Sequence, residues 1–359
     1  MKISLAIIVK NEEKYIERCL QSVSGLVDEI VAVDTGSTDN TVPLIKGMKN
    51  VKLYHFEWCD DFSLARNFSI EKTTGDYVLV LDADEYIVNG TRIEMESIMA
   101  KDIIGRIQIN SRFKKDNQEH HSKSYVSRFF PRDVRYKGAI HEQLDSERPR
   151  INTNFIVSHD GYFETNKSER NIPLLQKALE RSPMDGYYLF QLGKELRISK
   201  QYEEAFSFLK KSYELTNNKA AYYSELVVEL INSGKECGKA EILLVINQNE
   251  DILGNVSDFH FAKGMFYLDY CLNYPNQAQQ YIRSIESSFL SCLKLNQHDP
   301  IEFVQGTSSY LAMYNLGIYY EVTGYINEAM DYYAWSSEYG YLLAKRRLQE
   351  LIRDNKRTH

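Results

Sequence analysis

The sequence predicts an α/β domain with a mainly parallel sheet over residues 1–165 and an all-α domain of helical repeats over residues 166–359. In the first half, short apolar runs alternate with helical patterns, which is typical of βαβ units. After Asn166 the strand patterns stop and two similar helical segments recur. The chain has 359 residues, of which 43% are hydrophobic, so it is long enough for two domains with separate cores.

The first half opens with an apolar run at Ile3–Val9, which predicts a buried strand. Residues 12–23 then place apolar side chains at helical spacing. We expect further strands at residues 29–34, 51–58 and 77–81, with helices over residues 38–48 and 63–72 between them. From Gly105 to Phe163 the pattern is more polar and strand-like. This alternation predicts the mainly parallel sheet of the first domain.

Two segments of the second half, Leu189–Ser212 and Met313–Ser336, share one pattern. Each has a glycine on a first helix, an alanine about 12 residues later on a second helix, and then a large apolar residue, namely Gly193, Ala205 and Leu209 or Gly317, Ala329 and Tyr333. Small residues at these positions allow two helices to pack closely. The pattern resembles the tetratricopeptide repeat, whose helix pairs stack into a solenoid, and a generic helical bundle is the alternative.

Composition excludes several classes of protein. The formal net charge is −7 with 26% charged residues, so we expect no binding to nucleic acid. The five cysteines form no CxxC pair, which argues against a zinc site or a disulfide framework and fits a reducing cytoplasm. The apolar run Ile3–Val9 is too short to span a bilayer and lacks a cleavage site. We therefore expect a cytoplasmic protein without a transmembrane segment.

The segment Tyr77–Tyr86, YVLVLDADEY, carries the most informative chemistry. A buried strand delivers Asp82 and Asp84 to its carboxyl end, where residues i and i+2 of an extended chain point the same way. Mg²⁺ and Mn²⁺ are usually held by carboxylates together with substrate phosphates. Open α/β sheets bind ligands at this end of their strands. The pair therefore predicts a metal–diphosphate site, with a polar turn after a core strand as the alternative.

Two other strand ends can contribute to a nucleotide pocket. Asp34 ends a strand, and Gly36 permits a tight turn after it. A carboxylate in this place can accept hydrogen bonds from a nucleobase or a ribose, or it can cap the next helix. The backbone around Val9 and Asn11 would form one wall of the pocket, whereas Asn11 and Glu12 could instead cap the helix that follows.

The segment WCDDFSLARN adds an acidic residue and a basic residue close to a helix start. Arg66 is either an ion-pair clamp among carboxylates or a ligand for phosphate, because a guanidinium binds either group in bidentate fashion. Asp61 either contacts the nucleobase or caps the helix. The sequence leaves both pairs of alternatives open.

Four segments in this order, IIVKNEEKYIERCLQSV, EIVAVDTGSTDNT, DDFSLARN and GDYVLVLDADEY, resemble the inverting family 2 nucleotide-sugar glycosyltransferases, which have the GT-A fold. The resemblance covers about Ile3–Tyr86. It implies that Asp34 contacts the nucleoside of a UDP-sugar, that Asp82 and the adjacent Ala83 approach the ribose or metal, and that Asp84 ligates Mg²⁺ or Mn²⁺. Many members have a second acid where this chain has Thr35, so the choice of nucleobase stays open.

A basic loop with Arg128, Arg132 and Arg135 leads to His141 and Glu142. Inverting transfer needs a base opposite the leaving diphosphate, and Glu142 or His141 fits that task. Arg128, like Arg66, would stabilise the charge on that diphosphate.

His159 follows another strand and could complete a metal shell, while an ordinary hydrogen-bonding role is the alternative for each histidine. These assignments depend on resemblance. The HE pair after a KG turn and the HDGY segment resemble a subgroup that joins the catalytic domain to tetratricopeptide repeats. That subgroup includes sublancin-type peptide S-glycosyltransferases, which modify bacteriocin precursors.

The resulting hypothesis is transfer of a hexose, with UDP-glucose as the first expected donor, to a Cys or Ser of a precursor peptide. The helical repeats would hold the acceptor peptide or glycan, or build a homodimer. Two alternatives remain. One is a glycosyltransferase for cell-surface polysaccharide or a lipid-linked glycan, and the other is a tetratricopeptide adaptor with a degenerate catalytic domain.

Overall fold

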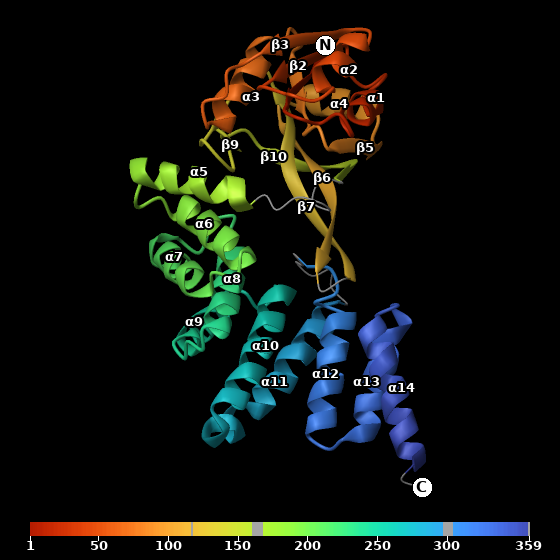
Figure 1. Cartoon of the computed structure of the whole chain (residues 1–359), viewed down its shortest axis with the longest axis vertical. Helices are drawn as coiled ribbons and strands as arrows, with labels where there is room; N and C mark the ends of the chain where they lie inside the picture. Colours follow the sequence, from red (N-terminus) through yellow and green to blue (C-terminus); the bar gives the residue numbers. More distant parts are fainter. Residues whose placement is uncertain (116–117, 160–167, 297–303, 358–359) are drawn as a thin grey trace. The chain divides into compact units, whose positions relative to one another are not determined.

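The structure is a computed structural model that describes residues 1–115, 118–159, 168–296 and 304–357 (Figure 1). The chain divides into two compact units, Met1–Ala178 and Leu179–His359. An α/β unit followed by a helical unit confirms the predicted fold class. The boundary expected between residues 165 and 166 lies outside the described residues, as do residues 160–162 of the HDGY segment.

The first unit contains an eight-stranded mixed sheet with the strand order β3-β2-β1-β4-β7-β6-β10-β5. Strands β1, β2, β3 and β4 run parallel to one another, β7 is antiparallel to β4 and β6, and β10 is parallel to β6. The strands are β1 (Ile3–Val9), β2 (Glu29–Asp34), β3 (Val51–His55), β4 (Tyr77–Val80), β5 (Glu85–Asn89), β6 (Ile104–Lys115), β7 (Gln118–Pro131) and β10 (Arg150–His159). A separate short ribbon pairs β8 (Tyr136–Lys137) with β9 (Gln143–Leu144).

The third strand is shorter than the sequence predicts. It ends at His55 rather than at residue 58, because its sheet neighbour β2 ends at Asp34, the register partner of His55. The parallel strands β1, β2 and β4 therefore bring their carboxyl ends to one edge of the sheet.

Helices cover both faces of this sheet. Alternate residues of β1 enter different cores, because successive side chains of a strand point to opposite faces. Ile3, Leu5 and Ile7 pack with α1, α2 and α4, whereas Ala6 packs with α3 and the β8–β9 ribbon. Each buried leucine or isoleucine contributes about 1.5–3 kcal/mol. The helices of this unit are α1 (Ile16–Ser22), α2 (Thr41–Gly47), α3 (Phe62–Glu71), α4 (Arg92–Met99) and α5 (Ser168–Arg181), whose last residues extend into the second unit.

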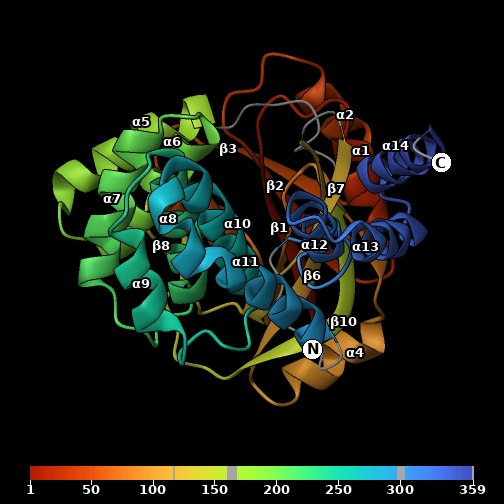
Figure 2. The same cartoon turned by 90° about the horizontal axis from the view of Figure 1, so that it is seen from below.

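The second unit consists of helices that pack as successive neighbours, with α6 on α7, α10 on α11 and α12 on α13 (Figure 2). They are α6 (Gly186–Ile198), α7 (Tyr202–Leu215), α8 (Tyr223–Glu236), α9 (Ile242–Asn249), α10 (Ser257–Asn273), α11 (Pro275–Leu295), α12 (Tyr310–Val322), α13 (Ile326–Glu338) and α14 (Leu342–Arg357). Among the described residues of the whole chain, no helix combines the length and apolar character needed to cross a membrane.

The small residues identified in the repeats lie where paired helices approach most closely. A Cβ at Gly193 would come within 2.5 Å of Leu209, and a Cβ at Gly317 would come within 2.6 Å of the Tyr333 ring. In both pairs the large residue of the second helix fills the space that the glycine leaves on the first. The repeat pattern read from the sequence therefore corresponds to helix-pair packing.

We predict that Gly317→Ala lowers the free energy of unfolding by about 1–3 kcal/mol, because the added methyl overlaps the buried ring of Tyr333. The direction of this change distinguishes two effects. Without the overlap, replacing glycine with alanine would stabilise the helix by up to about 1 kcal/mol. Urea unfolding followed by circular dichroism measures the change. Gly47→Ala is the matched control, because a Cβ at Gly47 of α2 meets nothing within 4 Å. A Gly317→Ala protein as stable as wild type would refute close packing at this position.

Candidate functional site

Asp34 lies buried at the carboxyl end of β2. Its carboxylate accepts hydrogen bonds from the backbone N–H groups of Gly36 at 3.2 Å and Ser37 at 3.0 Å, and His55 Nδ1 lies 3.3 Å away. Burial acts to raise the pKa of Asp34, but these hydrogen bonds outweigh it and hold the pKa below its ordinary value. The carboxylate does not cap α2, whose N-cap residue is Asn40. Asp34 is thus an anionic acceptor fixed beside the ends of β1 and β3.

The end of β1 is joined to this loop through backbone groups. The carbonyl oxygen of Val9 accepts hydrogen bonds from both the N–H and the hydroxyl of Thr35, at 3.0 and 3.1 Å. Thr35, which stands where many family 2 members have a second acid, therefore serves the backbone. Asn11 has a φ of 57°, and its side-chain oxygen accepts from the N–H of Thr38 at 2.8 Å. The backbone of Val9–Asn11 thus lies beside the loop that follows Asp34.

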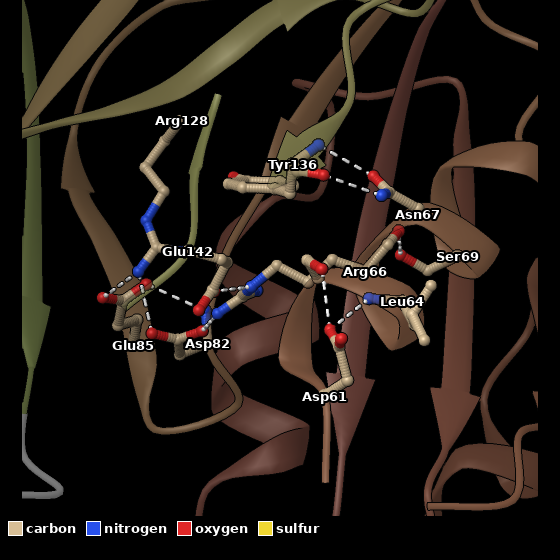
Figure 3. A network of polar contacts seen from close by, with 11 residues as sticks. Asp61, Leu64, Arg66, Asn67, Ser69, Asp82, Glu85, Arg128, Tyr136 and Glu142 are labelled. Atoms are coloured by element: carbon tan, nitrogen blue, oxygen red, sulfur yellow. Dashed lines mark hydrogen bonds and ion pairs between the residues drawn. The ribbon is translucent and has the colours of Figure 1, made fainter. Parts of the chain in front are cut away.

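The capping roles considered for Asn11, Glu12 and Asp61 have different outcomes. Asn11 bridges two loops, and Tyr15 is the N-cap residue of α1. The N–H of Glu12 donates to Thr41 Oγ1 at 2.7 Å, and its carbonyl oxygen accepts from the first turn of α1. Asp61 is the N-cap of α3 and accepts from the N–H of Leu64 at 3.0 Å (Figure 3). The structure therefore places Asp61 in the capping alternative.

Asp82 is held between two buried arginines (Figure 3). Arg66 Nη2 donates to one carboxylate oxygen of Asp82 at 2.7 Å, and Arg128 Nη2 donates to the other at 2.8 Å. Burial acts to raise the pKa of Asp82, but the positive charges of Arg128 and Arg66 hold the pKa well below its usual range. Arg66 is thus an ion-pair clamp in this structure.

Each arginine also reaches a second carboxylate. Arg66 Nε donates to Glu142 Oε1, and Arg128 Nη2 donates to Glu85 Oε1 at 3.2 Å. Burial raises the pKa of Glu85 above its ordinary value. When all the acids are ionised, three carboxylates face two guanidinium groups in this network. Buried charges are stable only when paired or bound to metal, so the excess negative charge favours a nearby cation.

The two arginines retain unused donors. Arg66 Nη1 and Arg128 Nε are fully buried and make no hydrogen bond within the described part of the chain. The buried hydroxyl of Tyr136, a residue of β8, likewise has no hydrogen-bond partner there. Leaving such groups unsatisfied costs about 1–3 kcal/mol each, and anionic oxygens are the strongest acceptors for guanidinium donors. These unsatisfied donors thus match the chemistry of a polyanionic ligand.

Asp84 contacts a different partner. His159 Nε2 lies 3.1 Å from Asp84 Oδ2, and both residues are less than 10% exposed. Ser111 Oγ lies 3.3 Å from the other ring nitrogen of His159. The expected parallel direction of Asp82 and Asp84 does not follow from an extended strand, because β4 ends at Val80 and a turn over Ala83 and Asp84 follows.

The Asp84–His159 pair could supply two of the ligands of a metal ion, with the other ligands coming from outside the protein. Within the described residues, no group of three or more His, Cys, Asp or Glu side chains is arranged to hold a metal ion alone. One carboxylate and one imidazole, completed by phosphate oxygens and water, suit Mn²⁺ or Mg²⁺ in a nucleotide site. Ala83 contributes no side-chain donor and is buried between the two acids of the turn.

Some residues identified in the sequence lie outside the network. Arg132 donates to the carbonyl of Thr73, and Arg135 donates to backbone carbonyls of its own loop, so both serve loop structure. His141 has a φ of 50°, a conformation that non-glycine residues rarely adopt, next to Glu142. Strained backbone of this kind is common in functional loops. Of the two residues of the HE pair, Glu142 is the one that accepts a hydrogen bond from Arg66.

Glu85, Tyr136 and Ser111 also contact the residues of the site, although no motif in the sequence singled them out. Glu85 follows Asp82 at turn spacing, which is the one local signal available. Tyr136 is fixed by Asn67, whose amide oxygen and nitrogen bind its backbone N–H and carbonyl at 2.8 and 2.9 Å. Arg66 Cζ lies 5.6 Å from the centre of the Tyr136 ring. These contacts join segments about 70 residues apart, so no local sequence pattern predicts them.

Two known proteins align with somewhat less than two thirds of this chain. The chain is 32% identical over 243 residues to the SPbeta prophage-derived glycosyltransferase SunS of Bacillus subtilis, covering 63% of this chain and 57% of that protein. It is 31% identical over 247 residues to a TPR repeat-containing protein of Synechococcus elongatus, covering 64% of this chain and 60% of that protein. The chain thus spans less than two thirds of the length of these relatives.

Among solved structures, the crystal structure of S. aureus TarS 1-349 in complex with UDP-GlcNAc covers 79% of this chain and 92% of that chain. Its TM-score is 0.39 at 14% identity, which is too low to support conclusions about ligands. Residues 4–158 match the family described as Glycosyl transferase family 2. This stretch contains Asp34, Arg66 and the Asp82–Glu85 turn, so the resemblance read from the sequence is confirmed. The similarity to glycosyl transferase family 2 thus covers residues 4–158, somewhat less than half of the chain.

Proposed function

We propose that the protein is an inverting, metal-dependent glycosyltransferase that transfers a hexose from a UDP-sugar, with UDP-glucose as the first candidate, to an acceptor nucleophile. The observation that carries the proposal is the clamp of Arg66 and Arg128 on Asp82, next to the Asp84–His159 pair. This arrangement combines unused guanidinium donors with an excess of carboxylates. A diphosphate and a divalent cation together satisfy both.

Asp34 would hold the nucleoside. Its carboxylate is anionic and fixed by the turn at Gly36 and Ser37, so it can accept hydrogen bonds from a base or a ribose without reorganising. The adjacent backbone of Val9–Asn11 forms one wall. His55 contacts the same carboxylate and is well exposed, so it can move aside when a nucleoside binds.

Asp84 and His159 would ligate Mg²⁺ or Mn²⁺ together with the diphosphate. When bound, the metal supplies positive charge to the leaving diphosphate. Arg66 and Arg128 supply further positive charge from fixed positions, and their unused N–H groups can donate to phosphate oxygens. Asp82 holds the two guanidinium groups in place, so they are preorganised before the donor binds.

Glu142 is our first candidate for the base that accepts the proton of the acceptor, and His141 is the second. Arg66 fixes the Glu142 carboxylate within the same network. A Cys thiol, with a pKa near 8.5, needs less help from a base than a Ser hydroxyl. Together with the resemblance to peptide-modifying enzymes that carry tetratricopeptide repeats, this favours a Cys or Ser of a peptide, held by the helical unit, as acceptor.

We predict metal-dependent release of UDP from at least one UDP-sugar, and a loss of about 100-fold or more in kcat for Asp84→Asn. The amide keeps the size of the side chain but removes the charge that holds the metal. A coupled UDP-release assay with and without EDTA measures both effects. Asp145→Asn is the matched control, because Asp145 forms an exposed pair with Lys137 on the β8–β9 ribbon. If no UDP-sugar and no other nucleotide sugar is turned over, the enzymatic proposal fails.

We further predict that Glu142→Gln lowers kcat by about 100-fold or more with little change in KM for the donor. Glutamine keeps an oxygen that can accept from Arg66 Nε but cannot take a proton at neutral pH. Initial rates with Cys- and Ser-containing peptides measure the effect, which should be smaller for the thiol acceptor. Full activity of Glu142→Gln would move the base assignment to His141, which His141→Asn would then test.

A further inference from the structure

Glu85 is the most buried carboxylate of the site, with 2% of its surface exposed. Nothing in the proposed reaction uses it, although a buried acid is costly unless it is paired. Its two side-chain oxygens have separate partners. Oε2 accepts the backbone N–H of Asp82 at 2.8 Å, and Oε1 accepts Arg128 Nη2 at 3.2 Å.

The contact with Asp82 closes a turn from both ends. The backbone N–H of Glu85 donates to the carbonyl of Asp82 at 3.0 Å, while the Glu85 side chain accepts from the N–H of Asp82. Ala83 and Asp84 lie inside this doubly closed turn. The directions of Asp82 and Asp84 are therefore both determined by the position of Glu85.

Glu85 also fixes the strand that carries His159. It is the first residue of β5, and its backbone is the register partner of His159, the last residue of β10. The imidazole that lies 3.1 Å from Asp84 is thus carried by the backbone that pairs with Glu85. One residue connects the turn, the arginine clamp through Arg128, and the histidine.

We propose that Glu85 is a positioning residue that assembles the metal–diphosphate site. By closing the turn, Glu85 holds Asp84 against His159. By accepting a hydrogen bond from Arg128 Nη2, which also donates to Asp82, Glu85 holds the guanidinium group of Arg128 in place. This inference depends on the proposed function, since it concerns the same metal and diphosphate. Both partners of the Glu85 side chain are donors, so the site needs two acceptor oxygens at this position.

Glu85→Gln tests this requirement with little change in volume. The amide of glutamine has one acceptor oxygen and one NH₂ group, so the NH₂ must face either the N–H of Asp82 or the guanidinium of Arg128. The turn or the clamp then loses a hydrogen bond. We expect Mn²⁺ to bind about 10–100-fold more weakly in the presence of UDP. Titration of free Mn²⁺ by electron paramagnetic resonance measures this directly, without a turnover assay.

Glu29→Gln is the matched control. Glu29 is a half-buried glutamate of the same sheet and accepts hydrogen bonds from Ser4, Lys52 and Thr74. It starts β2, whereas the site lies at the carboxyl end of that strand. Burial acts to raise the pKa of Glu29, but the bonds from Lys52, Ser4 and Thr74 lower it to about 2. Glu29→Gln should thus reduce stability and leave Mn²⁺ binding with UDP unchanged.

These measurements distinguish a failure of the proposed function from a failure of the positioning role of Glu85. If the wild-type protein binds no Mn²⁺ with UDP, the proposed function fails. If wild type and Glu29→Gln bind Mn²⁺, and folded Glu85→Gln binds it equally well, the role of Glu85 is overturned. Should Glu85→Gln not fold, Glu85→Asp takes its place, because the shorter side chain cannot reach both partners. About tenfold weaker binding by folded Glu85→Asp supports the proposal, and unchanged binding contradicts it.

Discussion

The double ion pair at Asp82 is the interaction on which the arrangement of the candidate site in the first unit depends. One guanidinium meets each oxygen of this carboxylate, with Arg66 coming from α3 and Arg128 from β7. Three segments that are distant in sequence are therefore joined at one carboxylate. Removing Asp82 would leave the two buried guanidinium groups with one carboxylate each, Glu142 for Arg66 and Glu85 for Arg128.

Because of this double ion pair, the two aspartates of the acidic turn, Asp82 and Asp84, have different roles. Asp82 is occupied by two arginines, so it serves best as the anchor of the cationic side of the site. Asp84, which contacts His159 and not the arginines, is therefore the acid that we propose as the metal ligand. A diphosphate between the arginines and the metal would contact fixed positive charge on both sides. Such preorganised charge is the form of electrostatic stabilisation that contributes most to enzymatic rates.

Much of this could be read from the sequence, because the relevant signals are local. Apolar runs and the spacing of Gly317 and Ala329 report on strands and helix pairs, and the acidic turn after β4 stands out as a motif. The alternatives for Arg66 and Asp61 could not be decided, because an arginine among carboxylates and an acid before a helix each have two common uses. Glu85 was missed because its partner Arg128 lies 43 residues away, on a strand that the sequence placed only coarsely.

We propose above all that the Asp82–Glu85 turn holds a metal-bound nucleotide. A crystal structure with UDP and Mn²⁺, with anomalous diffraction measured at the manganese edge, tests it most directly. We expect one anomalous peak within bonding distance of Asp84 and the diphosphate, with the nucleoside beside Asp34. A nucleotide or manganese ion bound away from this turn would contradict it.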